Sequence, residues 1–410
     1  MGWADTVIWW HCYPLGFVDA ERTAIDHTEH RLGRVANWLD YVVELGANGL
    51  LMAPVFASAS HGYDTLDHFR IDPRLGDDAD FDDLVARARE RGVRVLLDGV
   101  FNHVGAGHEI VRRALAGGPA SADGAWIRWV GDYPRGFEGN LDLVELDLAH
   151  PPVQDYVVSV MTHWLDRGVD GWRLDAAYAP GADAWRPIVD RVRAAHPDAW
   201  LLAEVIHGDY ADFVARSGVD SVTQYELWKA TWSSLNDHNL HELAWTLGRH
   251  AAFGASFRPL TFISNHDVTR IATKLTDPRA LPLATALLLL LPGVPSIYAG
   301  DEQGFTGEKT DGPRGDDAVR PPFPADPSGL APFGRDVHEL YQRLVALRRN
   351  HPWLVSAEPT VRVVTNDTMT IELAGGDQRL TLALNLSEAP VELPGTHGPL
   401  GVGPFGWALG

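Results

Sequence analysis

Four acidic residues stand at the ends of short, mostly apolar runs in this 410-residue chain: Asp98, Asp175, Glu204 and Asp267. Burying an ionised carboxylate is costly unless other groups compensate its charge. One acid in such a place is explained equally well as a helix cap or a turn former. Four of them, each at the end of an apolar run, predict a chemical site instead of a solvated surface.

Paired carboxylates suit the cleavage of a glycosidic bond. One attacks the anomeric carbon, and the other, held protonated, delivers a proton to the leaving oxygen. Arg173 precedes Asp175 by two residues, so both side chains point to the same face of a strand. We expect the guanidinium to keep Asp175 ionised and nucleophilic.

The runs before these acids belong to a longer alternation of strands and helices. Expected strands are 7–10, 48–53, 93–98, 171–175, 200–204, 221–223, 260–265 and 296–298, and expected helices include one capped by Asp80 and ending at Gly92, one over 153–165 and one over 337–347. Strands separated by helices pair in parallel. Eight such units predict an α/β fold with a closed (β/α)8 TIM barrel, and a doubly wound open sheet is the alternative. The carboxyl ends of barrel strands face one mouth, where active sites lie.

Two segments depart from this alternation. Residues 104–150, rich in Gly, Pro and aromatics, predict a short insertion after the third strand that lines the mouth. After the turn signal at 375–377, Leu380, Leu382, Leu384 and Leu386 alternate strictly. We therefore expect a barrel over 1–103 and 151–352, the insertion over 104–150, and a small antiparallel β domain over 353–410.

Composition narrows the expected partners. The chain has 34 Lys and Arg against 55 Asp and Glu, a formal charge of −21 that disfavours nucleic acid. The most apolar run, 281–291, is too short to span a bilayer, and the N-terminus shows no secretory signal. The single cysteine, Cys12, excludes an intrachain disulfide. We expect a cytoplasmic protein without nucleic-acid or membrane partners.

The acid-bearing segments resemble, in order, the four signature motifs of the α-amylase family (glycoside hydrolase family thirteen): 98–103, 171–175, 204–205 and 262–267. Residues 61–65 resemble the family's loop after the second strand, and Arg320–Pro322 resembles its late Arg-x-Pro element. The resemblance covers essentially the whole chain. It implies that Asp175 forms a covalent glycosyl-enzyme, that Glu204 protonates the leaving group and then activates water, and that Asp267 binds hydroxyls of the distorted sugar.

The resemblance also assigns the sugar contacts. His103 and His266 would hydrogen-bond the same ring, and Tyr63 would stack on its apolar face. Without the resemblance, both histidines read equally well as core or metal-binding residues. Asp98 would support the site without reacting, and Arg173 would lie beside the substrate.

Part of the family binds calcium through the asparagine that corresponds to Asn102, with further ligands from the insertion. Here the insertion is short, and no run of alternating acidic and Asn residues stands near the N-terminus. We therefore expect no metal ligands and no cofactor.

The substrate is expected to be a small oligosaccharide. Asp64 and Arg320, both near the mouth by the resemblance, would pair and close the pocket behind the first sugar, which favours attack at a chain end. A rim salt bridge without influence on the mode of attack is the alternative. Ala176, directly after the nucleophile, resembles members that prefer α-1,4 links.

The segments 13–17 and 204–210 most resemble intracellular cyclomaltodextrinases and neopullulanases, and α-glucosidase-type members. His207 would reach the leaving-group sugar, or be a loop histidine without that role. Such enzymes carry an N-terminal β domain that serves dimerisation, whereas this chain begins almost at the first strand, so we expect a monomer. We expect a hydrolase of maltooligosaccharides or cyclodextrins, with a transglycosylase and a non-catalytic binding barrel as alternatives.

Overall fold

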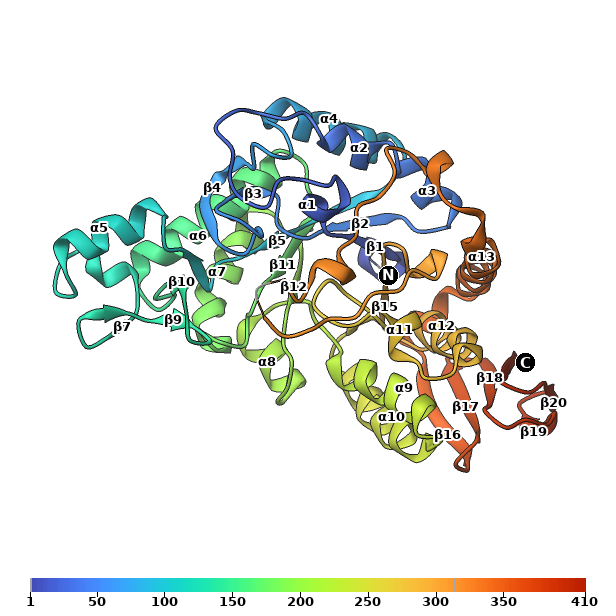
Figure 1. Cartoon of the computed structure of the whole chain (residues 1–410). Coiled ribbons are helices and arrows are strands. Elements are labelled where there is room, and N and C mark those ends of the chain that lie inside the picture. The colour runs from blue at the N-terminus through green and yellow to red at the C-terminus, as the bar shows by residue number, and fades with distance from the viewer. Residues whose placement is uncertain (1, 313) are drawn as a thin grey trace.

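The computed structural model describes residues 2–312 and 314–410 (Figure 1). Eight parallel strands form one sheet in the order β13-β12-β11-β5-β2-β1-β15-β14. Their bounds are β1 Trp9–Cys12, β2 Gly49–Met52, β5 Arg94–Gly99, β11 Gly171–Leu174, β12 Trp200–Ala203, β13 Ser221–Val222, β14 Leu260–Thr261 and β15 Val294–Tyr298. The two edges meet, because Thr223 forms a parallel bridge with Leu260. The predicted closed barrel is confirmed, and the open sheet is not observed.

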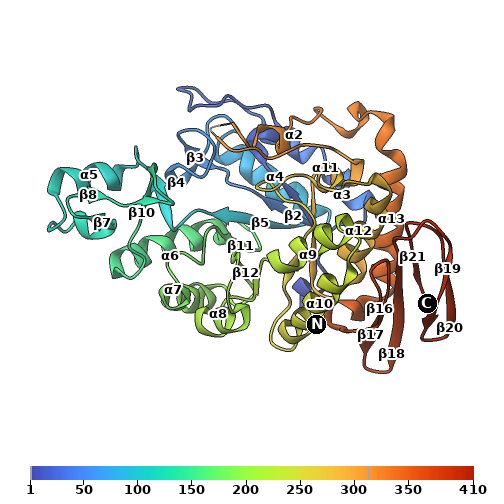
Figure 2. The same cartoon turned by 60° about the horizontal axis from the view of Figure 1, so that its bottom comes forward.

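Helices cover the outside of the barrel (Figures 1 and 2). The helices of the barrel are α2 Leu32–Ala36, α3 Leu39–Glu44, α4 Asp78–Glu90, α6 Pro151–Asp166, α7 Ala182–Ala195, α8 Tyr210–Ser217, α9 Tyr225–Asn236, α10 Leu240–Gly254, α12 Leu281–Leu290 and α13 Arg335–Asn350, and two one-turn helices, α1 Pro14–Phe17 and α11 Ile271–Lys274, lie in loops between them. One expected boundary was wrong. The cap of α4 is Asp77, which accepts from the backbone N–H groups of Ala79 and Asp80, while Asp80 accepts from that of Asp77. Asp80 is therefore the reciprocal partner of a capping box instead of the cap itself.

The barrel interior below the mouth is filled with apolar side chains. Trp9 of β1 stacks on Trp200 of β12, with 5.7 Å between ring centroids, and Leu51, Leu96 and Leu202 pack around them. Such layers make a solid floor instead of a pore. Polar groups at the strand ends therefore stand on an apolar base, away from bulk water.

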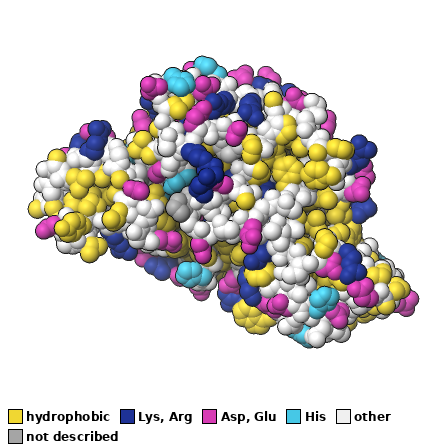
Figure 3. Space-filling model, viewed as in Figure 1, with side chains coloured by type: hydrophobic (Ala, Val, Ile, Leu, Met, Phe, Trp, Pro, Cys, Tyr) yellow, Lys and Arg dark blue, Asp and Glu magenta, His cyan; other side chains and the backbone are white. Residues whose placement is uncertain are grey.

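The segment after β5 forms a small subdomain that projects from one side of the barrel (Figure 1). It contains β6 His103–Gly105, α5 Glu109–Gly117, β7 Trp129–Val130, β8 Tyr133–Pro134, β9 Gly136–Phe137 and β10 Asn140–Glu145. β6 pairs with β10 and β10 with β9, so the subdomain is anchored directly beside His103. In Figure 3 hydrophobic side chains gather on this subdomain, and Val130, Tyr133 and Leu141 are among its exposed residues.

The chain ends in antiparallel strands beside α10 and α12 (Figure 2). A four-stranded sheet contains β16 Glu358–Val364, β17 Thr368–Gly375, β18 Gln378–Asn385 and β21 Gly406–Leu409, and a hairpin contains β19 Val391–Gly395 and β20 Gly398–Val402. Leu382, Leu384 and Leu386 are buried, as their alternation predicts. The turn at Gly376 has a φ of +58°, a conformation that favours glycine. None of the described helices combines the length and apolarity needed to cross a bilayer.

Candidate active site

Arg173 of β11 stands at the centre of three buried carboxylates. Its Nη1 lies 2.7 and 2.6 Å from the two carboxylate oxygens of Asp98, and 3.0 Å from Oδ1 of Asp175. Its Nη2 lies 2.8 Å from Oε1 of Glu204. All four side chains are buried. One guanidinium thus holds together three of the four acids that the sequence singled out.

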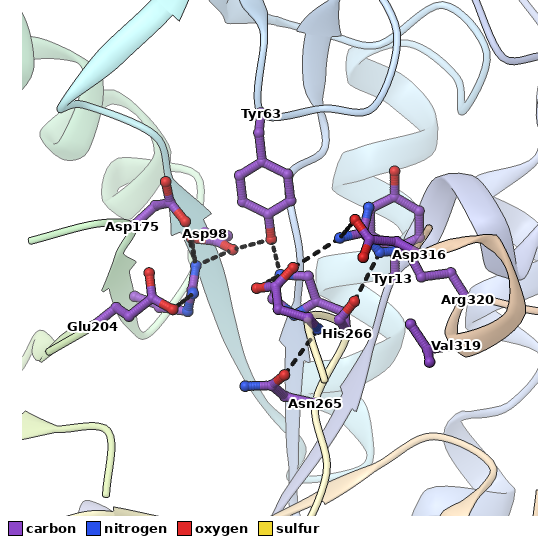
Figure 4. Close-up of polar contacts among 12 residues, drawn as sticks. Tyr13, Tyr63, Asp98, Asp175, Glu204, Asn265, His266, Asp316, Val319 and Arg320 are labelled. Carbon is purple, nitrogen blue, oxygen red and sulfur yellow. Dashed lines mark hydrogen bonds and ion pairs between the residues drawn. The ribbon is translucent and has the colours of Figure 1, made fainter. Parts of the chain in front are cut away.

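Strand register brings these residues to one level. Arg173 pairs across the sheet with Asp98 of β5 on one side and with Leu202 of β12 on the other. The ladder continues just past the strand ends, because the N–H of Asp175 donates to Gly99 O and that of Glu204 donates to Leu174 O. Short parallel strands with matched register therefore deliver acids that are distant in sequence to the same mouth (Figure 4).

Glu204 is fixed by two further donors. The backbone N–H of Ala176 donates to Oε2 at 2.9 Å, and the hydroxyl of Tyr225 donates to Oε1 at 3.0 Å. Asn265 Nδ2 in turn donates to the Tyr225 oxygen at 3.0 Å. Sequence reasoning missed Tyr225. Its available signal was its position at the start of α9, directly after the sixth barrel strand.

Burial sets the electrostatics of this cluster. It raises the pKa of Asp175 well above the ordinary value, Arg173 opposes that rise, and the negative charges of Glu204 and Asp98 add to it. Burial likewise raises the pKa of Asp98, again against the effect of Arg173. The expectation that Arg173 alone keeps Asp175 ionised was therefore incomplete, because one guanidinium faces three buried acids. Because three buried acids share one positive charge, the cluster as a whole favours retention of a proton on one of its carboxyl groups.

Asp267 belongs to a second, more open group. Its Oδ1 lies 2.8 Å from Arg320 Nη2, and its Oδ2 lies 2.9 Å from His266 Nε2. Burial by itself would raise the pKa of Asp267, but His266, Arg320 and Arg173 hold it well below its usual range. The carboxylate is ionised and its side chain is 31% exposed, so it can accept hydrogen bonds from a bound molecule.

Tyr63 joins the two groups (Figure 4). Its hydroxyl donates to Asp98 Oδ2 at 3.1 Å and also contacts His266 Nε2. Its ring is parallel to that of His266, with 5.4 Å between centroids. The side chains expected to surround one sugar ring, Tyr63 and His266, are thus brought together with Asp267.

The expected pair between Asp64 and Arg320 was wrong. Arg320 contacts Asp267 and Asp316 instead, the latter at 3.1 Å. Asp64 accepts from the backbone N–H and the hydroxyl of Ser60, at 3.1 and 2.5 Å. Asp64 is therefore committed to its own loop, and a closed pocket built on this ion pair is not present.

Two further predicted sugar contacts are His103 and His207. His103 is buried against Phe137 of the insertion, with 4.7 Å between nearly parallel rings, and burial lowers its pKa to about 4. The neutral ring can both donate and accept hydrogen bonds. His207 is exposed, and its ring centroid lies 6.1 Å from that of Tyr178 in the loop after β11.

Comparisons with known proteins agree with this geometry. The model of the α-amylase catalytic domain matches residues 11–141 and 132–329. The chain belongs to the α-amylase family. This membership makes it a glycoside hydrolase by family and confirms the resemblance on which the motif assignments rest.

Two relatives and one solved structure show how far the likeness extends. A cyclomaltodextrinase of Geobacillus thermopakistaniensis is 28% identical over 427 residues, which cover 96% of this chain and 71% of the relative. An intracellular maltogenic amylase of Bacillus subtilis is 27% identical over 335 residues, covering 75% of this chain and 57% of that protein. The cyclic α-maltosyl-(1→6)-maltose hydrolase of Arthrobacter globiformis, solved with that sugar, superposes with a TM-score of 0.85 at 25% identity and covers 99% of this chain and 98% of its own.

Asn102, the residue that corresponds to a calcium ligand in part of the α-amylase family, is buried beside His103. The Asn102 side-chain amide lies 3.2 Å from Nδ1 of His103, and Asn102 is buried. Within the described ranges, the one group of three possible carboxylate or imidazole ligands is His30, Asp77 and Asp80, on the surface at the start of α4. Calcium prefers six to eight oxygen ligands.

Proposed function

We propose that this chain is a retaining hydrolase of α-glucosidic bonds, chiefly α-1,4 bonds in short maltooligosaccharides or cyclodextrins. The observation that carries the proposal is the shared guanidinium of Arg173, which holds Asp175 and Glu204 side by side at the mouth. Two carboxyl groups held close to each other suit double displacement at one anomeric carbon.

In the first step a carboxylate oxygen of Asp175 attacks the anomeric carbon while Glu204 gives its proton to the departing glycosidic oxygen. The C–O bond to the leaving sugar breaks, and a glycosyl ester with Asp175 forms. In the second step Glu204 takes a proton from water, the water oxygen attacks the same carbon, and the ester bond breaks. Two inversions return the α-anomer.

The surrounding groups would bind the sugar in the first of these steps. Asp267, ionised and partly exposed, would accept from ring hydroxyls, with His266 beside it. Tyr63 offers an aromatic face. His103, held by Phe137, would supply a neutral hydrogen-bonding group from the insertion side.

The substrate class rests on the relatives' names and on fold similarity. One relative is named a cyclomaltodextrinase, and the neighbouring structure contains a cyclic maltosyl-maltose. A transglycosylase would use the same residues and pass the glycosyl group to a second sugar, with the outcome set by access of water to the intermediate. We propose a cytoplasmic monomer without a bound metal. The single buried Cys12 and the relative named as intracellular support the cytoplasmic location.

Two substitutions test the proposal. Asp175→Ala and Glu204→Gln should each abolish turnover of unactivated maltooligosaccharides, while circular dichroism shows the fold intact. Polarimetry of the wild-type reaction should show the α-anomer as first product. Ordinary rates in either variant, or a β-product, would contradict the assignment.

A second experiment determines the mode of attack. Maltotetraose labelled at its reducing end is digested, and the first products are separated by chromatography. Early glucose with labelled maltotriose shows attack from the non-reducing end, whereas early maltose shows a more open cleft. Since Asp64 and Arg320 do not pair, the structure favours the second result.

A further inference from the structure

A small cavity lies inside the barrel, directly beneath the group formed by Asp267 and His266. Its volume is about 20 Å³, and its lining includes His11 of β1, Leu51 of β2 and His266. Such a volume holds about one water molecule, provided that two or more polar groups face it. Its lining also includes Arg173 and Asn265, so the cavity adjoins the lower side of the acid cluster.

Two of the lining residues supply those polar groups. His11 Nε2 and His266 Nδ1 are both buried and have no hydrogen-bond partner among the described residues. His11 is 5% exposed and His266 is 0% exposed. Their ring centroids lie 5.0 Å apart, with the rings at 77°. A buried polar atom without a hydrogen bond destabilises the folded state by about 1–3 kcal/mol. We therefore expect each of the two nitrogens to have a hydrogen-bond partner.

The ring of His266 is already fixed in orientation. Tyr63 and Tyr13 lie parallel to it, with centroids 5.4 and 6.3 Å away. Its Nε2 lies 2.9 Å from Asp267 Oδ2, an ionised oxygen that can only accept. Nε2 must therefore carry a proton, and in the neutral ring Nδ1 is then an acceptor. Nδ1, which has no partner among the described residues, therefore needs a hydrogen-bond donor.

We propose that the cavity binds one water molecule, which accepts a hydrogen bond from His11 Nε2 and donates one to His266 Nδ1. His11 is then a positioning residue. Through the water it satisfies Nδ1 of His266, and so it supports the tautomer with the proton on Nε2 and fixes the ring beside Asp267. The part of this inference that concerns sugar binding rests on the proposed function.

The charges around His11 agree with this assignment. Burial lowers its pKa well below the ordinary value, and the positive charges of Arg173 and Arg320 add to that effect, against Asp267. A neutral His11 carries a proton on one nitrogen only. That proton, placed on Nε2, makes His11 the donor that the water requires.

Three variants separate this role from simple packing. His11→Leu removes the donor, and His11→Gln keeps an amide that can donate to the water. Leu51→Val changes the same cavity without touching a polar atom, and serves as the matched control. Folding of each is checked by circular dichroism and thermal unfolding.

The first readout does not depend on activity. A high-resolution crystal structure of the wild type should show one ordered water between the two nitrogens. The ring ¹⁵N chemical shifts of His266, assigned by comparison with His266→Gln, should show protonation at Nε2 alone. In His11→Leu the ordered water should be lost and the Nδ1 signal of His266 should shift, because the hydrogen bond to Nδ1 is lost, whereas His11→Gln and Leu51→Val should keep both. A cavity without ordered density, or an unchanged His266 signal in His11→Leu, would overturn the inference.

Kinetics supply the second readout. With maltotetraose, kcat/KM should fall about tenfold in His11→Leu and by no more than about twofold in the other two variants, as expected for loss of one hydrogen bond. Equal losses in Leu51→Val and His11→Leu would show a packing effect and overturn the positioning role. If the wild type does not cleave maltotetraose, the proposed function is contradicted. The electron density and the ¹⁵N shifts then still test whether the cavity binds the water.

Discussion

Arg173 holds Nη2 2.8 Å from Oε1 of Glu204 while its Nη1 contacts Asp98 and Asp175. This single side chain carries the only guanidinium among the three buried acids of the described cluster. The charge balance and the relative placement of the two proposed catalytic carboxylates therefore depend on it.

Replacement of Arg173 by lysine should disrupt both the charge balance of the buried acids and the placement of Asp175 and Glu204. A single ammonium cannot span the three acids as a planar guanidinium does. Leaving buried carboxylates without their partner costs about 3–5 kcal/mol. We expect a loss of stability of that order in urea unfolding, together with loss of measurable turnover. Arg186→Lys is the control, because Arg186 forms an exposed pair with Asp190, and it should leave both quantities unchanged. Wild-type stability in Arg173→Lys would contradict the central role of the guanidinium.

Tyr225→Phe should slow only those reactions that need a proton from Glu204. The substitution removes the hydroxyl that donates to Glu204 Oε1 at 3.0 Å. We expect kcat on maltotetraose to fall about tenfold, the effect of one lost hydrogen bond to a charged group. α-Glucosyl fluoride, whose leaving group needs no general acid, should react at nearly the wild-type rate in the glycosylation step. Tyr210→Phe, which removes a hydroxyl bonded to Ile206 O, is the control, and an equal loss on both substrates would refute the assignment.

Glu302 should make stability depend on pH. It is buried behind β15, where it accepts from Tyr41 and Trp10, and burial raises its pKa to about 7. Between pH 4.5, near its unfolded value, and pH 7 the folded state binds a proton that the unfolded state releases, so the free energy of unfolding falls as pH rises. That contribution amounts to about 3 kcal/mol at most.

Glu302→Gln, which resembles the protonated acid, should flatten the pH dependence over that window. The measurement is urea unfolding at several pH values between 4.5 and 7.5. Glu308→Gln, in a loop whose residues are largely exposed, is the matched control. The same slope in Glu302→Gln as in the wild type would show that Glu302 does not titrate there.

Chelation should leave the enzyme unaffected. The side-chain amide of Asn102 contacts His103, and as proposed above no metal is bound, so we expect EDTA to change neither the melting temperature nor the rate on maltotetraose. Calorimetry and initial rates, each with and without added calcium, make the comparison. A fall in melting temperature that calcium reverses would show a metal site and contradict the proposal.

Much of this protein could be predicted from its residues alone. The strand periodicity and the acids that end the strands depend on local sequence, and a parallel barrel must collect its strand ends at one mouth. Asp98, Arg173, Asp175 and Glu204 were therefore expected together, and they lie together. The C-terminal β-sheet was likewise predictable, because apolar residues at every second position indicate a strand with one buried face.

Contacts between long side chains and loops were decided by the tertiary structure. The resemblance places Arg320 near the mouth, and in the structure its side chain contacts Asp267 and Asp316 instead of Asp64. Tyr225 reaches Glu204 only because the sixth strand brings the start of α9 to the mouth. The pKa of Asp175 follows from how many acids are buried around one guanidinium, and the cavity between His11 and His266 follows from packing in three dimensions. Such features depend on distances between segments far apart in the chain, which local pattern does not encode.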